Sequence, residues 1–376
     1  MRWSRRSETI LEKALRLPWG FIALIVGLAV LGTAMLYSST ITNPEVADLP
    51  RKHFTRFALS FVLMIALALT PLKFWKQAAV PAYVGTFVLL IGVELVGDSG
   101  GGAQRWLEIG PLRMQPSELM KLALVLAIAQ YYHNFQKDNS GGFLIHLPAL
   151  ALILAPAALI LKQPDLGTTL TLVAAGGVMI YFAGIYWWVI VAAIAGTFAA
   201  AVPAYVYVLE EYQRDRIRAL WDPTADPLGA NYQGEQAKIA IGSGGFDGKG
   251  FTQGTQSQLD FIPEQHTDFI FTVVAEEFGF LGATSVLLIW LGVIVWGFFF
   301  AMRSHSLFGR YAGIGAVATM AFYVAFNIGM VAGLLPVVGI PLPLLSYGGT
   351  AMITVMAGFG LLLSVDLHRD DPLKGA

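Results

Sequence analysis

The stretch WGFIALIVGLAVLGTAMLY, residues 19–37, contains no charged side chain. A helix rises about 1.5 Å per residue, so a helix of this length nearly crosses the roughly 30 Å hydrocarbon core of a bilayer. Basic residues precede it at Arg2, Arg5, Arg6, Lys13 and Arg16. The apolar run is too long for the hydrophobic region of a cleaved signal peptide. We therefore expect a retained first transmembrane helix.

The composition of the whole chain agrees with this expectation. Of the 376 residues, 56% are hydrophobic and only 13% are charged, a balance typical of membrane proteins that cross the bilayer several times. The net charge is -1 and the basic residues are spread along the chain, so nucleic acid is not an expected partner. The absence of cysteine excludes disulfides, thiolate catalysis and cysteine-ligated metals.

Segments of about 17 to 25 apolar residues predict an all-α polytopic membrane protein with about ten transmembrane helices. The predicted spans are 19–37, 54–71, 77–96, 116–133, 143–161, 166–183, 186–208, 280–302, 311–333 and 347–366. We find no internal repeat and no soluble domain, so residues 1–376 form one predicted integral membrane domain. Its longest polar segment is the loop 209–279, between helices 7 and 8.

The distribution of basic residues predicts the orientation. An even number of spans places both termini on one side, and lysine and arginine in alternate short loops favour the cytoplasm for that side. The loop 209–279 then faces outward. Arg51, Lys52 and Arg56 lie on the outer side in this topology and argue against it.

The long loop ends in GTQSQLDFIPEQHTDFIF, residues 254–271, which brings Asp268 to the start of an apolar helix. A carboxylate where water meets hydrocarbon needs a structural partner or a function. If the helix begins at Thr267, then Thr272 and Glu276 lie on the same face as Asp268. Alternatively, Thr267 caps the helix and Asp268 stabilises its dipole.

Two further motifs precede predicted spans. In QPSELMK, residues 115–121, Glu118 and Lys121 are three positions apart on one helix face. They form a structural ion pair, or Lys121 binds an anionic head group while Glu118 orients it; the two interpretations are compatible. In QPDLGTT, residues 163–169, Asp165 either caps a helix or presents its carboxylate in an outer turn.

Two segments are irregular by composition. The run GSGGFDGKG, residues 242–250, is either a flexible loop or a phosphate-binding turn with Lys249 supplying charge, and it lacks the strand and helix that a nucleotide-binding loop requires. The segment 334–349, LLPVVGIPLPLLSYGG, is too rich in proline to be helical and too apolar for a solvated loop. It is either a rigid connector or the wall of a site for a lipid-linked substrate, with Ser346 and Tyr347 as candidate contacts.

Five motifs, MQPSELMK, KQPDLGTT, ADPLGANYQGEQAKIAIGSGG, GTQSQLDFIPEQHTDFIF and GLLPVVGIPLPLLSYGG, occur in this order over nearly the whole chain. Together they resemble the SEDS family (shape, elongation, division and sporulation proteins), and the wording NIGMVAGLLPVVGIPLPLLSYGG is more similar to its elongation branch, RodA, than to its division branch, FtsW. The resemblance implies a bacterial inner-membrane peptidoglycan glycosyltransferase that polymerises lipid II during elongation and rod-shape maintenance. It also implies a class B penicillin-binding protein and other membrane proteins of the elongation complex as partners.

By this resemblance Asp268 matches the catalytic aspartate of the family, while Glu118 and Lys121 match its functionally important pair in the fourth helix. Polymerisation joins the 4-OH of one sugar to the anomeric carbon of another and expels undecaprenyl diphosphate, an anion that needs no general acid. Our hypothesis is an inverting single displacement with Asp268 as general base. The cations that would offset the diphosphate charge are Lys121, Arg105, Arg214 and Arg218.

Three questions remain open at the level of sequence. Glu276 either tunes Asp268 or, together with it, holds a divalent cation such as Mg²⁺ or Mn²⁺, and no other cofactor is expected. A different class of function, a transporter (flippase) of lipid-linked precursor, would use the same apolar cavity without forming a bond. A scaffold without activity would tolerate replacement of Asp268. The lack of an inverted repeat and the polar residues gathered on one side favour the enzyme.

Overall fold

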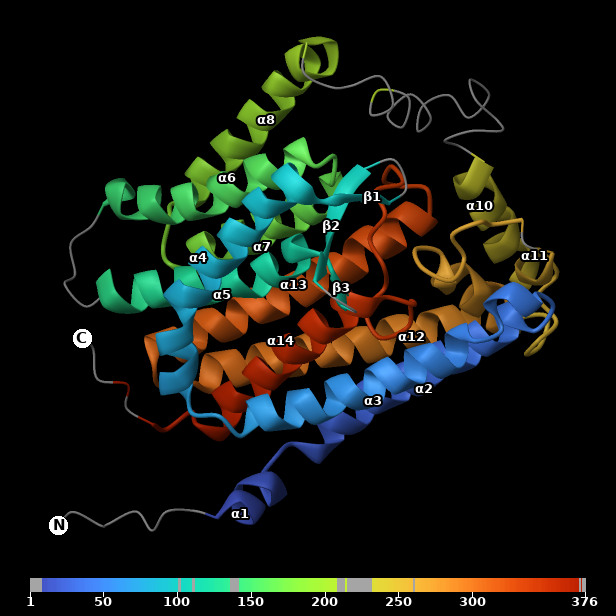
Figure 1. The fold of residues 1–376 in the computed structure, drawn as a ribbon, viewed down its shortest axis with the longest axis horizontal. Coiled ribbons are helices and arrows are strands. Elements are labelled where there is room, and N and C mark those ends of the chain that lie inside the picture. The colour runs from blue at the N-terminus through green and yellow to red at the C-terminus, as the bar shows by residue number, and fades with distance from the viewer. Residues whose placement is uncertain are drawn as a thin grey trace.

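The computed structural model describes residues 9–100, 103–109, 112–135, 142–207, 214, 232–259, 261–371 and 373, and it is an almost entirely helical bundle (Figure 1). The helices of its first half are α1 (Ile10–Leu15), α2 (Trp19–Thr40), η1 (Pro44–Val46), α3 (Leu49–Ala68), α4 (Leu72–Val96) and α5 (Pro116–Phe135). Those of its second half are η3 (Phe143–His146), α6 (Leu147–Lys162), α7 (Leu166–Phe182), α8 (Trp187–Tyr207), α10 (Tyr232–Gly244), α11 (Thr255–Gln258), α12 (Ile270–Arg303), α13 (Leu307–Val331) and α14 (Gly349–Leu367).

The all-α polytopic class is confirmed. Each predicted apolar segment overlaps a helix, and six helices of the described chain are long and apolar enough to span a membrane: α2, α4, η3 with α6, α12, α13 and α14. The number of helices that cross the bilayer, and the treatment of the chain as one domain, stay predictions.

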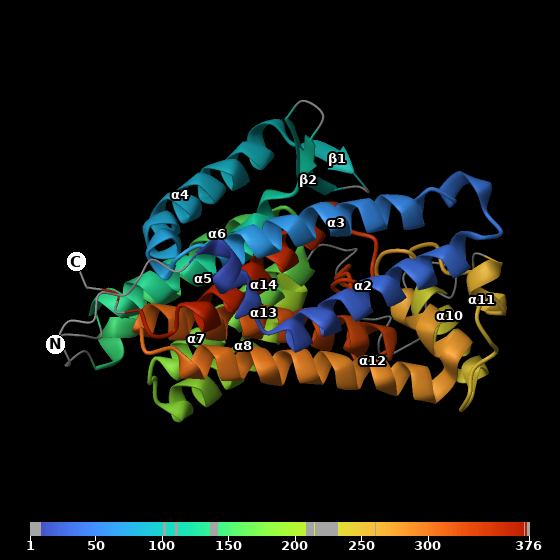
Figure 2. The same cartoon turned by 90° about the horizontal axis from the view of Figure 1, so that it is seen from below.

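The centre of the bundle is formed by α13, which packs against α5, α7, α12 and α14. In α13 and in α14, 72% of the most apolar 18-residue stretch is buried inside the protein, against 17% in α4. Figure 2 shows α4 at an outer edge of the bundle, beyond α3 and α5. Because the central helices are apolar on all sides, their side chains bury one another, while the apolar face of α4 is left for lipid.

The two ends of the bundle differ. At one end Lys13 Nζ of α1 lies 3.2 Å from His368 Nε2, directly after α14. At the opposite end Thr42 Oγ1, after α2, donates to the carbonyl of Gln258 in α11 at 2.9 Å. Figures 1 and 2 show α10 and α11 together at this second end, far from α1. The segment that precedes α12 therefore lies at the end of the bundle opposite to the described ends of the chain.

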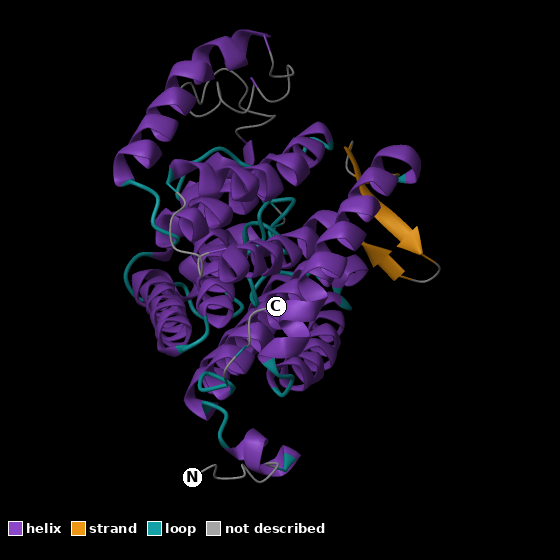
Figure 3. Ribbon diagram, turned by 90° about the vertical axis from the view of Figure 1, so that its left-hand side faces the viewer, coloured by secondary structure: helices purple, strands orange, loops and turns teal. Residues whose placement is uncertain are grey.

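A small antiparallel sheet was not predicted from the sequence. Its strands β1 (Asp98–Gly100), β2 (Ala103–Ile109) and β3 (Leu112–Met114) are adjacent in chain order. They lie at the edge of the molecule (Figure 3), where β2 contacts α4 and α5. Two of the strands, β1 and β3, have three residues each and are too short to show the alternation that identifies a strand in a sequence. The sheet matters because β2 and β3 carry arginines toward the site described below.

Helix α12 begins ten residues before the predicted span 280–302 and is interrupted at Gly279, where φ is +62° and ψ is -158°. The outer part, 270–278, carries Thr272, Glu276 and Glu277 and falls in the predicted loop 209–279, although one interpretation of Asp268 begins a helix at Thr267. The backbone groups that the break releases are satisfied by the residues 245–250, called here the glycine turn. Lys249 N–H donates to Glu276 O at 3.1 Å, Gly250 N–H to Glu277 O at 2.9 Å, and Phe280 N–H to Gly245 O at 2.9 Å.

Candidate active site

A cavity of about 610 Å³ opens among the sheet, the starts of α5, α7 and α14, the segment before α12, and the irregular chain between α13 and α14. We call it the polar cavity. Its charged lining residues are Arg105, Arg113, Glu118, Asp165, Glu264 and Asp268. One wall is apolar and comes from Val337, Val338 and Pro341. The cavity thus places six charged groups, from five separate stretches of the sequence, beside an apolar surface.

Asp268 lies in the cavity on a turn that precedes α12. The N–H groups of Asp268 and Phe269 donate to the carbonyl of Glu264 at 3.1 and 3.2 Å, and the helix begins only at Ile270. The expectation that Thr267 caps the helix is wrong, since its Oγ1 donates to Glu264 Oε2 at 2.9 Å. The geometry therefore holds the half-buried Asp268 by its backbone, ahead of the helix and outside its first turn.

The backbone of Asp268 is also bound from α13. Asn327 Nδ2 donates to the carbonyl oxygens of Asp268 and Ile340, at 2.7 Å in each case. Gly339, between these groups, has φ of +70°, and a Cβ built on it would lie 3.4 Å from Asp268 Oδ2. Sequence reasoning missed Asn327, although a buried amide within an apolar span is itself a signal for a specific partner.

Glu118 and Lys121 form the predicted ion pair in α5, with Nζ 2.7 Å from Oε1 and both side chains buried. The hydroxyl of Tyr323, from α13, completes the group: it accepts a hydrogen bond from Lys121 and donates one to Glu118. Glu118 lines the polar cavity, whereas Lys121 faces a small pocket between α5, α13 and α14. The ion pair is present, and Lys121 is not among the residues that line the polar cavity; its role as a cation for the substrate stays a prediction.

Asp165 caps α7, as the first of the two interpretations of its motif predicts. Its Oδ1 accepts from Thr168 N–H at 3.1 Å, and its Oδ2 accepts from Gln115 Nε2 at 2.9 Å. Arg105 fixes the neighbouring turn: its Nε donates to Gln163 O at 3.1 Å, and its Nη2 donates to Pro164 O. Both residues line the cavity while their polar groups hold its frame.

Residues 332–348 are irregular, as predicted, and they form the wall between α13 and α14. Leu344 has φ of +65°, and its carbonyl lies 3.1 Å from His53 Nε2 of α3. Ser346 is a buried turn residue whose Oγ accepts from Leu342 N–H at 2.8 Å. Tyr347 lines the cavity, its N–H donating to His266 O at 2.8 Å. Of the two candidate contacts, Tyr347 alone reaches the polar cavity.

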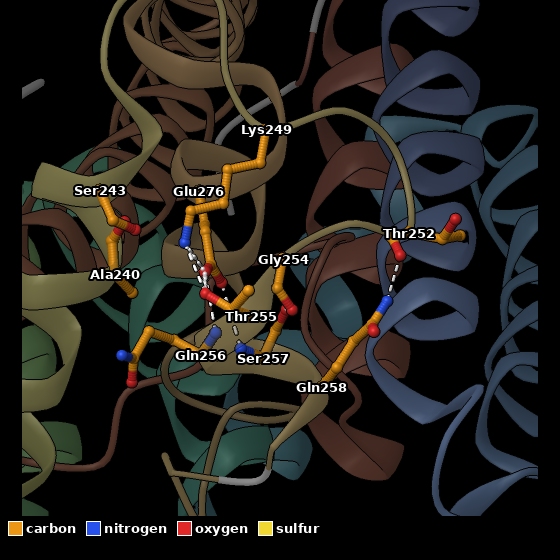
Figure 4. A network of polar contacts seen from close by, with 10 residues as sticks. All are labelled: Ala240, Ser243, Lys249, Thr252, Gly254, Thr255, Gln256, Ser257, Gln258 and Glu276. Carbon is orange, nitrogen blue, oxygen red and sulfur yellow. Dashed lines mark hydrogen bonds and ion pairs between the residues drawn. The ribbon is translucent and has the colours of Figure 1, made fainter.

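Glu276 lies in a separate cluster, which Figure 4 shows from close by. Its Oε1 accepts from Lys249 Nζ at 2.6 Å and from Gln256 N–H at 2.8 Å, and its Oε2 accepts from Ser257 N–H at 3.1 Å. The carboxylate is fully buried. Because these donors already occupy both oxygens, a divalent cation shared with Asp268 does not fit. Across the described ranges, no three His, Cys, Asp or Glu side chains are grouped to hold a metal.

A known protein family matches nearly the whole chain. Residues 15–371 match the family model described as "Cell cycle protein", which covers FtsW, RodA and SpoVE. This chain belongs to that family. The resemblance to SEDS proteins seen in five motifs is thereby confirmed over nearly the whole length.

The chain is 40% identical to one relative, the "Peptidoglycan glycosyltransferase MrdB" of Escherichia coli K12, over 92% of this chain and 93% of that one. Its identity to the "Probable peptidoglycan glycosyltransferase FtsW" of Escherichia coli O6:H1 is 34%, over 91% and 84%. Thermus thermophilus RodA superposes with a TM-score of 0.72 at 28% identity, over 95% and 99%. A chain from a structure described as "Structural coordination of polymerization and crosslinking by a peptidoglycan synthase complex" gives a TM-score of 0.79 at 31% identity, over 95% and 98%.

For two arginines, the structure differs from the cations that were predicted for the site. Arg113, on β3, was missed: its guanidinium carbon lies 5.0 Å from the centre of the Trp106 ring, and the side chain is 49% exposed. Arg214 was predicted as a cation of the site, but it donates to Val206 O at 2.9 Å at the end of α8 and does not line the cavity. Arg218 lies outside the described residues, as does much of the predicted loop 209–279.

Proposed function

We propose that this protein is a peptidoglycan glycosyltransferase that polymerises lipid II during cell elongation. The name of its relative MrdB and the likeness to RodA support the enzyme class and the elongation branch. The observation that carries the chemistry is Asp268, held by its backbone inside a 610 Å³ cavity that also contains arginines and an apolar wall. A lipid-linked sugar diphosphate has the parts that such a cavity would complement.

In the proposed reaction Asp268 accepts the proton of the acceptor 4-OH. The oxygen of that hydroxyl attacks the anomeric carbon of the donor. The bond between that carbon and the diphosphate oxygen breaks, and undecaprenyl diphosphate leaves with the electron pair. One displacement inverts the donor from an α to a β linkage. The leaving group is a stable anion, so one base and nearby cations supply what the step requires.

The cation best placed for the diphosphate is Arg113. The donors of Arg105 are directed at the carbonyls of Gln163 and Pro164. Arg113 instead lies over the Trp106 ring, and its ion-pair partner among the described residues is the exposed Glu108, at 3.8 Å. A planar guanidinium matches phosphate oxygens with two parallel hydrogen bonds. Arg105 then acts by fixing β2 against the turn before α7.

The partner and the orientation are part of the proposal. We propose a class B penicillin-binding protein as partner, in the bacterial inner membrane, with the termini cytoplasmic and the polar cavity outside. The likeness to a chain of a peptidoglycan synthase complex supports the first. The orientation is supported by the fold, because α1 and the end of α14 lie at the end of the bundle opposite to α10 and α11. Co-purification that brings down no transpeptidase would remove the partner.

The absence of cysteine allows a direct test of orientation. Leu259→Cys lies beside α11 and His305→Cys lies between α12 and α13, and both positions are exposed. In intact spheroplasts a membrane-impermeant maleimide should label residue 259 and leave residue 305 unlabelled until the cells are lysed. The reverse pattern would invert the topology.

Glycan-strand formation tests the function. Purified protein with its cognate transpeptidase receives labelled lipid II, and wild type is compared with Asp268→Asn and with Glu264→Gln, a second acid of the same cavity. Polymer from wild type and Glu264→Gln, but not from Asp268→Asn at equal thermal stability, supports the proposal. Polymer from Asp268→Asn would move the base to another residue. No polymer from wild type with the partner bound would favour the transporter.

A further inference from the structure

We infer that Asn327 is a positioning residue that sets the location of the Asp268 carboxylate against the irregular wall of the cavity. The inference rests on the proposed function of Asp268. Asn327 is fully buried in α13, and its one NH2 group joins two segments that are more than seventy residues apart, the turn before α12 and the wall at Ile340.

The direction of the amide is determined by its partners. Carbonyl oxygens accept hydrogen bonds and cannot donate them, so the Asn327 nitrogen, and not its oxygen, must face Asp268 O and Ile340 O. The Asn327 oxygen is buried and has no hydrogen-bond partner within the described part of the chain. An amide that leaves its own oxygen unpaired while both of its N–H groups are used is present for those donors.

Gly339 shows why the join matters for the carboxylate. The hydrogen bond from Asn327 to Ile340 holds the preceding residue, Gly339, beside the Asp268 side chain, where a Cβ would be 3.4 Å from Oδ2. The φ of +70° at Gly339 is one that residues with a side chain rarely adopt. Asn327 and Gly339 therefore act as one unit: the first joins the two backbones, and the second adopts the positive φ that places the wall in van der Waals contact with the carboxylate.

This arrangement is expected to affect the rate of reaction more than substrate binding. A general base must lie within about 3 Å of the hydroxyl that it deprotonates. A displacement of about 1 Å can cost on the order of 10²-fold in rate. Neither Asn327 nor Gly339 supplies a charge to the diphosphate, so their loss should leave lipid II binding nearly unchanged.

The test uses the full-length protein with its transpeptidase and compares Asn327→Leu and Gly339→Ala with wild type. We expect kcat for glycan formation to fall by about 10- to 100-fold, with KM for lipid II within about twofold of wild type. Ser364→Ala is the matched control, because Ser364 is also buried and donates to a backbone carbonyl of another segment, Thr70 O, at 2.7 Å. It lies about 20 Å along α14 from Ala351, the nearest residue of that helix that lines the cavity. It should lower thermal stability without lowering kcat.

Combination with Asp268→Glu separates positioning from general damage. If Asn327 acts through Asp268, the double variant should lose much less than the product of the two single losses. Multiplied losses, or a wild-type kcat for folded Asn327→Leu, would overturn the inference. If Asn327→Leu does not fold, Gly339→Ala decides by the same criteria. Full activity of Asp268→Asn would instead overturn the proposed base, whatever the Asn327 variants show.

Discussion

Asp268 and Glu276 are eight residues apart, yet the structure treats the two carboxylates in opposite ways. Glu276 is fully buried, and its oxygens accept hydrogen bonds from the Lys249 ammonium and from two backbone N–H groups. Asp268 is half-buried on the wall of the polar cavity, and its hydrogen bonds to Glu264 and Asn327 are made by its backbone. A fully buried carboxylate whose oxygens accept from fixed donors holds structure, whereas a half-buried one on the wall of a 610 Å³ cavity is within reach of a bound substrate.

The largest effect that tests this contrast is expected for Asp268→Glu. The carboxylate is retained but displaced by one methylene group, so glycan formation should fall by about 10²-fold, which corresponds to about 2.7 kcal/mol in the barrier. The melting temperature should stay at the wild-type value. Kinetics on labelled lipid II with a parallel thermal melt would show both. A large fall in melting temperature would make Asp268 structural, like Glu276.

Glu276→Gln should give the opposite result. It removes the charge that partners Lys249 and weakens hydrogen bonds to a buried anion, so the free energy of unfolding should fall by about 2 kcal/mol. Activity per folded molecule should stay within about threefold of wild type. Thermal denaturation in detergent measures the first and lipid II polymerisation the second. An unaltered melting temperature with lost activity would place Glu276 in the chemistry.

Lys249→Met is expected to be milder. The Lys249 side chain is 24% exposed, and Glu276 retains the N–H groups of Gln256 and Ser257. We expect a loss of about 1 kcal/mol in stability. If Lys249 bound a phosphate of the substrate, as one interpretation of the glycine run allows, KM for lipid II would rise instead. Substrate titration of the variant distinguishes the two.

The smallest effect is expected for Glu264→Gln. Glu264 lines the cavity but is exposed, and the contact that holds the Asp268 turn is made by its backbone carbonyl, which the substitution keeps. Stability should change by less than about 0.5 kcal/mol. Glycan formation should change less than twofold in the same assay. A loss as large as that of Asp268→Glu would show that side-chain exposure in the cavity, rather than Asp268 alone, marks the reactive carboxylate.

The sequence predicted the helices well because apolar runs long enough to cross a bilayer leave few alternatives. It also placed Glu118 with Lys121 and Asp165 at a cap, since both depend on spacing along one helix. The predicted span 280–302 stops short of the helix, because Thr272, Glu276 and Glu277 end the hydropathy pattern while the helical backbone continues outward to Ile270.

The cavity itself could not be read from the sequence. Asn327, Tyr323 and Arg113 reach it or support it from α13 and from β3, and their positions depend on how distant segments pack. The pairing of Glu276 with Lys249 likewise crosses 27 residues, so the periodicity that placed Glu276 on the face of Asp268 carried no information about it. Family resemblance identified Asp268, but the contacts that hold it are tertiary.

The close packing of the glycine turn on the break in α12 has a consequence for mutational scans of this chain. A Cβ at Gly248 would lie 2.2 Å from Glu277 O, and one at Gly279 would lie 2.4 Å from Gly248 N. Every substitution at these two positions should therefore be depleted in a growth selection as strongly as changes at Asp268. A parallel measurement of protein abundance in the membrane would separate the groups, since the glycine variants should be degraded and the Asp268 variants should accumulate normally.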